Sequence, residues 1–173
     1  MVHTSRETQR FGFLTAVEDE DRGTVGGLLV TNQFGRPLEF QCTTPVHPNK
    51  TQRILYGPTL RAFILTDVIG NTLLSKVTLK PLVVFVEHLV WLELRRLHPI
   101  PVILVVRPRA EHPGKTLTLG NQHLHISEEF AEDWPVLESL INTLPNTADL
   151  LEPFERVREA LQETLKSNLA RPA

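Results

Sequence analysis

The sequence of 173 residues contains a single cysteine, Cys42. One cysteine excludes an internal disulfide framework and a zinc site built from several cysteines. Long hydrophobic runs are missing too, since the longest apolar stretch, Leu82–Val86, has the length of a β-strand. A membrane-spanning helix needs about 20 apolar residues, so none is expected. Residues 1–10 hold no apolar run, and we therefore expect no secretory signal and a soluble, cytoplasmic protein.

An excess of charge of one sign is absent as well. The chain holds 18 Lys and Arg against 20 Asp and Glu, a formal net charge of −2. A general nucleic-acid binder usually has a dominant basic field, which the whole chain lacks. The charge is segregated, however, because residues 127–163 are strongly acidic and residues 1–126 carry a small basic excess. A basic surface can therefore form in the first part, and the acidic block is interpreted as a solvated helical face.

Several motifs of catalysis and phosphate binding do not occur. The sequence has no G-x-S-x-G, no G-x-x-x-x-G-K-[ST], no G-x-G-x-x-G and no H-E-x-x-H pattern. Gly26-Gly27 lies within an apolar run and precedes no helix, so it is not a phosphate-binding loop. This pair indicates a bulge or a close approach of another element to the backbone.

What is present predicts a three-stranded antiparallel meander at the start of the chain. Residues 11–17, 25–31 and 37–42 have strand length and are joined by short turns rich in charged residues, Asn and Gly. In the third strand Leu38, Phe40 and Cys42 share one side of the pleat. We interpret this side as the core-facing one, which makes Cys42 a buried, inert thiol.

The next segment predicts a long helix over residues 51–76. Thr51 is the expected N-cap, and Gly57-Pro58 is expected to kink the helix or to divide it in two. Its apolar positions recur at three, four and five residues, beginning with Ile54 and Leu55. This spacing predicts a broad, well-buried face.

Two doubly buried strands follow, at residues 82–86 and 102–106, with a short helix between them over residues 89–97. A strand, helix and strand in succession predict a parallel pair. A hairpin over residues 116–126 and helices over residues 134–144 and 149–169 complete the chain. We therefore predict one α/β domain over residues 11–169, with a mixed sheet flanked by helices, a flexible segment 1–10 and a frayed tail 170–173.

The order of elements over about residues 11–106 resembles the ribonuclease H-like topology, as an analogy that does not by itself assign a function. Nucleases of that type need several carboxylates that hold divalent metal ions. Asp67 in the long helix and Glu87 after a buried strand are the candidates for such a cluster. The first strand holds no acid, and Glu18 only follows it. Asp67 as a surface residue and Glu87 as a helix cap are the alternatives.

Two further groups of residues are candidates for binding. His123 and His125 share one face of a predicted strand, a spacing seen among metal ligands, although an ordinary edge strand has the same pattern. Ligands of open α/β sheets favour the carboxyl ends of parallel strands. There we expect an anion- or nucleic-acid-binding surface, unless the loop is merely solvated, formed by His88, Arg107, Arg109 and Lys115.

The segment Gly26–Leu60 resembles a segment of an uncharacterised family of bacterial proteins, which shares the pattern G-x-L-V-T-x-x-x-G-x-P-L-E-F found here at Gly27–Phe40. The resemblance implies a bacterial origin and a shared fold, and it carries over no activity.

The absence of a catalytic constellation and the segregated charge favour a non-catalytic interaction or regulatory module that contacts another macromolecule, most simply a protein. The alternative is a nucleic-acid-binding or metal-dependent nuclease-like domain. No recognisable motif makes the chain an enzyme, no cofactor is predicted, no membrane contact is expected, and the sequence leaves the oligomeric state open.

Overall fold

A computed structural model describes residues 9–111 and 114–169 of the chain. The predicted segments at the two ends therefore lie largely outside the described residues. Among the described residues no helix is long and apolar enough to cross a membrane. One mixed sheet of seven strands runs through the protein in the order β3-β2-β1-β4-β5-β7-β6.

The strands confirm the predicted α/β class and element order. The meander consists of β1 (Arg10–Asp19), β2 (Gly23–Asn32) and β3 (Pro37–Cys42), and its neighbours pair antiparallel. Strands β4 (Val83–Val86) and β5 (Val102–Val106) pair parallel to each other, and β4 also pairs parallel to β1. The predicted hairpin forms from β6 (Leu117–Leu119) and β7 (Gln122–His125), and β7 joins the edge of β5.

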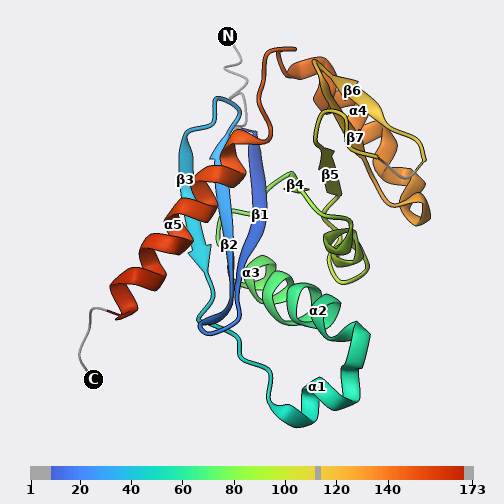
Figure 1. Ribbon diagram of the computed structural model, residues 1–173. Coiled ribbons are helices and arrows are strands. Elements are labelled where there is room, and N and C mark those ends of the chain that lie inside the picture. The colour runs from blue at the N-terminus through green and yellow to red at the C-terminus, as the bar shows by residue number, and fades with distance from the viewer. Residues whose placement is uncertain (1–8, 112–113, 170–173) are drawn as a thin grey trace.

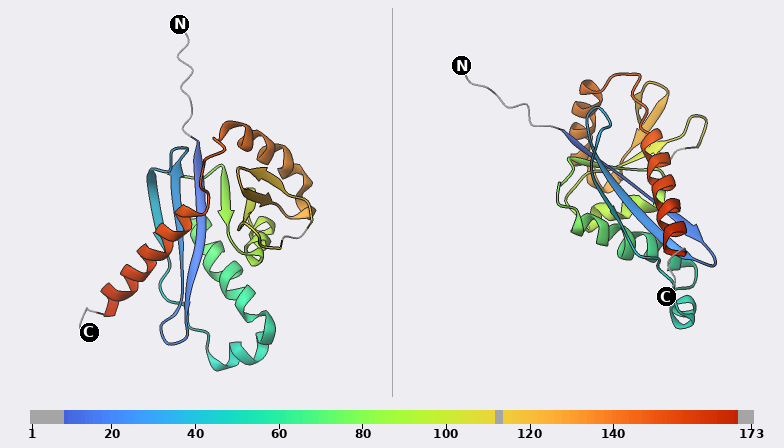
Figure 2. Two further views of the ribbon diagram at one scale, coloured as in Figure 1. Left: turned by 45° about the horizontal axis from the view of Figure 1, so that its top comes forward. Right: turned by 90° about the vertical axis from the view of Figure 1, so that its left-hand side faces the viewer.

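Helices cover both faces of this sheet (Figure 1). One face carries α4 (Trp134–Thr143) and α5 (Glu152–Leu169), which follow the short helix η4 (Glu128–Asp133). The other face carries η2 (Phe63–Gly70), α3 (Asn71–Lys76) and η3 (Leu89–Arg96). Two hydrophobic cores result, one on each side of the sheet. Figure 2 shows α5 lying obliquely across the long strands of the meander.

The long helical segment begins with α1 (Lys50–Tyr56), η1 (Gly57–Thr59) and α2 (Leu60–Ala62), so the predicted break at Gly57-Pro58 is confirmed. The predicted N-cap and the predicted buried face at its start are wrong. Asn49 caps α1, because its Oδ1 accepts a hydrogen bond from the backbone N of Gln52. Ile54 and Leu55 are 69% and 78% exposed, since α1 lies away from the sheet (Figure 1).

The expected orientation of β3 is also wrong. Cys42 is exposed, and Leu38 and Phe40 each keep 38% of their surface accessible. The opposite side of the strand is the anchored one: the Glu39 carboxylate accepts hydrogen bonds from the backbone N of Thr78 and of Leu79. These bonds favour the ionised form and lower the pKa of Glu39 to about 2. Because β3 is an edge strand, its alternation did not reveal which side is covered.

Gly26 and Gly27 let a helix approach each face of the sheet at one point. A Cβ atom on Gly26 would lie 2.0 Å from Cγ2 of Ile69 in η2, and one on Gly27 would lie 2.8 Å from Cγ1 of Val157 in α5. The expectation of a close approach is therefore confirmed. An L side chain at either position would overlap a side chain of the adjacent helix, which would have to shift.

Replacement of Gly26 by alanine tests this contact. We expect Gly26→Ala to lower the free energy of unfolding by about 1–3 kcal/mol, since the new methyl group overlaps Ile69. The loss in the double variant with Ile69→Ala should be smaller than the sum of the single losses. Urea denaturation measures these values. Gly12→Ala is the control, because the nearest atom to its Cβ would lie at 3.2 Å instead of 2.0 Å; an equal loss there would contradict the interpretation.

Candidate functional site

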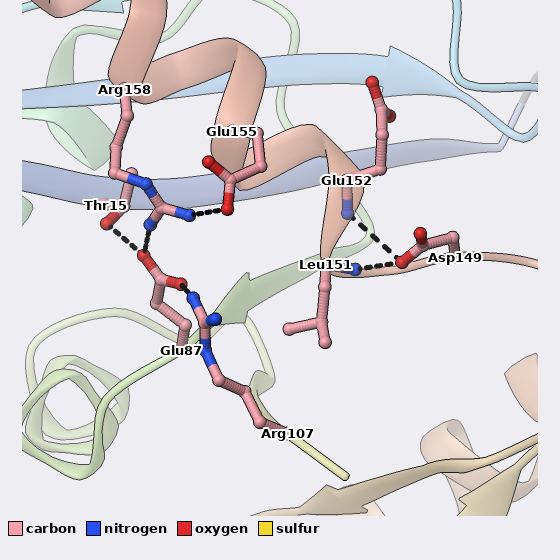
Figure 3. Close-up of polar contacts among 8 residues, drawn as sticks. All are labelled: Thr15, Glu87, Arg107, Asp149, Leu151, Glu152, Glu155 and Arg158. Atoms are coloured by element: carbon pink, nitrogen blue, oxygen red, sulfur yellow. Dashed lines mark hydrogen bonds and ion pairs between the residues drawn. The ribbon is translucent and has the colours of Figure 1, made fainter.

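The site lies where the parallel strands end, around the carboxylate of Glu87. Glu87 directly follows β4, and its side chain is 1% exposed. In the pairing register Leu14 of β1 lies opposite Val86, so Thr15 lies next to Glu87. The Thr15 hydroxyl donates a hydrogen bond of 2.7 Å to Oε1 of Glu87 (Figure 3).

Two arginines complete the surroundings of this carboxylate (Figure 3). Arg107, directly after β5, donates from Nη2 to Oε2 of Glu87 at 3.1 Å. Arg158 of α5 donates from Nη1 to Oε1 of Glu87, and its Nη2 contacts Glu155 at 2.6 Å. Both carboxylate oxygens thus have cationic partners, which offsets the cost of burying the charge. We call Glu87, Thr15, Arg107 and Arg158 the Glu87 cluster.

The two arginines differ in how far they reach solvent. The Arg158 side chain is 23% exposed, whereas that of Arg107 is 56% exposed. Arg158 is therefore a largely internal partner of Glu87. Arg107 keeps much of its surface accessible, and it can contact an anion from solvent at the same time.

Arg109 belongs to a tight turn that follows β5. The backbone N of Ala110 donates to the carbonyl O of Arg107 at 3.1 Å, and Arg109 has a φ of 66°. With Pro108 between them, this arrangement matches a type II turn, in which the third position strongly prefers glycine. A long cationic side chain at this position costs about 1–2 kcal/mol of backbone strain. Strained residues of this kind cluster at functional sites.

The other residues predicted for the anion-binding surface lie outside the Glu87 cluster. His88 is exposed and immediately precedes η3. Lys115 also is exposed, and its Nζ lies 4.4 Å from the centre of the Trp134 ring, a cation–π contact. The structure brings only Arg107 of the four into direct contact with Glu87.

The two candidate carboxylates do not meet. Asp67 is exposed on η2, which packs on the face of the sheet opposite to α5. Glu87 points to the α5 face, where Arg158 contacts it. Glu87 also does not serve as a helix cap, since η3 begins after His88 without a side-chain cap.

The histidine pair has partners other than a metal. His125 is 3% exposed, and its Nδ1 lies 2.6 Å from the carbonyl O of Lys115. His123 Nδ1 lies 3.4 Å from the hydroxyl of Thr118. Within residues 9–111 and 114–169 the structure gathers no group of three or more His, Cys, Asp or Glu side chains suited to a metal ion.

Sequence reasoning did not find Thr15 and Arg158. Thr15 follows Phe11 and Phe13 at steps of two, and this periodicity places its hydroxyl on the side of the α5 core. That signal was available in the sequence. Arg158 lies 71 residues from Glu87, and it was interpreted as part of a solvated helical face. Nothing in a single sequence pairs two such distant residues.

Comparison with known proteins identifies the fold. No family model and no curated protein sequence matches the chain. The crystal structure of human endonuclease V is similar with a TM-score of 0.54 and 11% identity, over 94% of this chain and 86% of that chain. Endonuclease V of Ciona intestinalis, in complex with a DNA 23mer containing an inosine, has a TM-score of 0.40 and 15% identity, over 77% and 57% of the two chains.

The likeness to human endonuclease V shows a common fold at an identity that does not carry over an activity. The ribonuclease H-like element order predicted from the sequence is confirmed. The predicted non-catalytic interaction or regulatory module receives no support from the comparisons, since the protein that shares this fold is an endonuclease.

Removal of one guanidinium at a time tests the Glu87 cluster. We expect Arg158→Met to lower the free energy of unfolding by about 3 kcal/mol, because it leaves a buried carboxylate undercompensated. Arg107→Met should cost less, about 1 kcal/mol, because this guanidinium is half exposed and water can take its place beside the buried carboxylate. In a Glu87→Gln background the effect of Arg158→Met should shrink. Urea denaturation of the single and double variants measures these free energies. Equal losses of stability for the two arginine variants would contradict the description of Arg158 as the internal partner of Glu87.

Proposed function

We propose that the protein binds nucleic acid through a basic edge formed by Arg107 and Arg109 at the carboxyl end of β5, next to that of β4. The observation that carries the proposal is the presence of two arginines, Arg107 and Arg109, in a tight turn directly after β5 of an endonuclease V-like fold. Phosphate groups suit the planar guanidinium, which binds two oxygens at once.

The position of the basic edge supports this proposal. Ligands of open α/β sheets bind beyond the carboxyl ends of the parallel strands, and Arg107 lies there with more than half of its side chain accessible. The acidic block of the sequence lies mainly on α4, η4 and α5. Several of its carboxylates are already paired, among them Glu129 with Arg96 and Asp133 with Arg95.

Binding is favoured over metal-dependent cleavage by the chemistry of the Glu87 cluster. Divalent metal ions in nucleases need several carboxylate oxygens at one place. Glu87 is one carboxylate, and both of its oxygens contact guanidinium groups. A divalent cation there would face two positive charges, so the residues present do not fit a metal centre of this kind.

Nucleic-acid binding can be measured by fluorescence anisotropy with a labelled 20-nucleotide single strand. We expect dissociation constants of about 10⁻⁶–10⁻⁴ M near physiological salt, as for sequence-independent binding. Removal of two phosphate contacts by Arg107→Ala with Arg109→Ala should make the negative slope of log K, where K is the association constant, against log salt shallower by about 1.4. The control is Lys76→Ala with Lys166→Ala, which removes the same charge from exposed positions elsewhere.

The outcomes of this experiment separate the possibilities. No binding at low salt, or equal losses in the two double variants, would refute the basic edge. Incubation of the strand with Mg²⁺ or Mn²⁺ should leave it intact. Cleavage that disappears in Glu87→Gln would replace the proposal by a nuclease.

Arg109 offers a test in which stability and binding change in opposite directions. Arg109→Gly should raise the free energy of unfolding by about 0.5–1 kcal/mol, since glycine adopts a positive φ without strain but has a more flexible unfolded chain. The same change should weaken binding of the single strand. Arg109→Ala is the matched variant, because it should weaken binding equally without gaining stability. A loss of stability in Arg109→Gly would show that the side chain is structural.

A further inference from the structure

A large cavity lies away from the Glu87 cluster, toward the amino end of β1. Its volume is about 1230 Å³, and it opens between the β2–β3 turn, the connection from α4 to α5, and the start of α5. Phe11 and Phe13 of β1 line it, together with Leu144 and Leu150. Ligand pockets usually measure about 300–1,000 Å³, so this one has room for a nucleobase with its sugar.

Phe34 stands at the rim of this cavity and is 86% exposed. The turn that carries it is firmly held, since Oδ1 of Asn32 accepts hydrogen bonds from the backbone N of Phe34 and of Arg36. Nη1 of Arg156 in α5 donates to the carbonyl O of Gly35 at 2.9 Å and ties the turn to the helix. The structure thus presents an aromatic ring on a preorganised support, which lowers the entropic cost of binding.

The charges around the cavity do not oppose a neutral aromatic ligand. Asp149 caps α5, with its Oδ1 accepting hydrogen bonds from the backbone N of Leu151 and Glu152 (Figure 3). Glu152 forms an ion pair of 3.0 Å with Arg156. Both carboxylates of the lining are therefore engaged within the protein. Arg36, next to the turn glycine, is exposed and supplies a positive charge outside the cavity.

We infer that this cavity takes an unpaired nucleobase of a bound single strand, with the base stacked on Phe34. The inference rests on the proposed function and adds a second contact to it. Proteins that bind single strands without reading sequence stack the bases on aromatic side chains. Nearby guanidinium groups contact the sugar–phosphate backbone of the nucleic acid. In a duplex both faces of a base are covered by its neighbours, so the base cannot stack on the Phe34 ring. The contact therefore selects single strands.

The cavity and the basic edge lie within reach of one short oligonucleotide. Phe11 lines the cavity and Thr15 belongs to the Glu87 cluster, and both lie on β1. Four residues of an extended strand cover about 13 Å, and each strand across the sheet adds about 4.8 Å. A strand of 20 nucleotides is long enough to contact both places.

Phe34→Ala tests the inference, because the side chain is so exposed that its loss leaves the fold intact. We expect this variant to bind the 20-nucleotide single strand about tenfold more weakly (about 1.4 kcal/mol), with unchanged binding of the matching duplex. Leu89→Ala is the control, since Leu89 is 53% exposed on η3, outside the cavity lining. Equal affinities of Phe34→Ala and the wild type for the single strand would overturn the inference.

Phe34→Trp gives a direct optical signal of base stacking at this position. This variant should retain the affinity, and its added fluorescence should be quenched by dT20 as a base stacks on the indole. Leu97→Trp, at a site 45% exposed after η3, should not be quenched. If the wild type binds the single strand and the Arg107 and Arg109 variants weaken binding, but the Phe34 variants do not, only this inference is refuted. No binding by the wild type refutes the proposed function and this inference together.

Discussion

The approach of α5 to the sheet at Gly27 determines where the charged groups of this protein meet. Thr15 of β1 lies opposite Gly27 in the antiparallel register, and the missing side chain lets Val157 rest against the backbone. Arg158, the next residue of α5, then reaches the carboxylate at the end of β4. Gly26 gives η2 the same access on the other face. The two adjacent glycines of β2 thus place η2 and α5 at the same position along this strand, one on each face of the sheet.

The Glu87 cluster illustrates how one fold can host different chemistry. The carboxyl ends of parallel strands bring side chains from distant parts of the chain together, whatever those side chains are. In this protein they gather one carboxylate, one hydroxyl and two guanidinium groups, in which the buried charge is compensated internally. Such a set orients both arginines and leaves Arg107 accessible to solvent, and it lacks the excess negative charge that attracts divalent cations. The shared fold therefore describes the scaffold, and the side chains decide what it binds.

The sequence predicted the parts of the fold in which periodicity and burial agree. The runs Leu82–Val86 and Val102–Val106 are apolar on both faces, and both form central strands. The prediction failed where an element has only one covered side. The alternation of β3 is clear, but the covered side holds Glu39, whose carboxylate caps backbone N–H groups, and apolar Phe40 stays accessible. In α1 the apolar residues continue a helical pattern into a segment that buries none of its residues.

The candidate site was predictable only in part for a similar reason. Strand ends can be located from local patterns, and these identified Glu87 and Arg107. The contact of Arg158 with Glu87 depends on how a helix near the end of the chain crosses the sheet, which local patterns do not contain.

The accessible Cys42 at the end of β3 gives the molecule a unique chemical handle. It is the one thiol of the chain, and it lies on an edge strand, so a maleimide dye or spin label will occupy a single known position. Distances measured from that label to a second engineered position will report on the arrangement of the elements in solution.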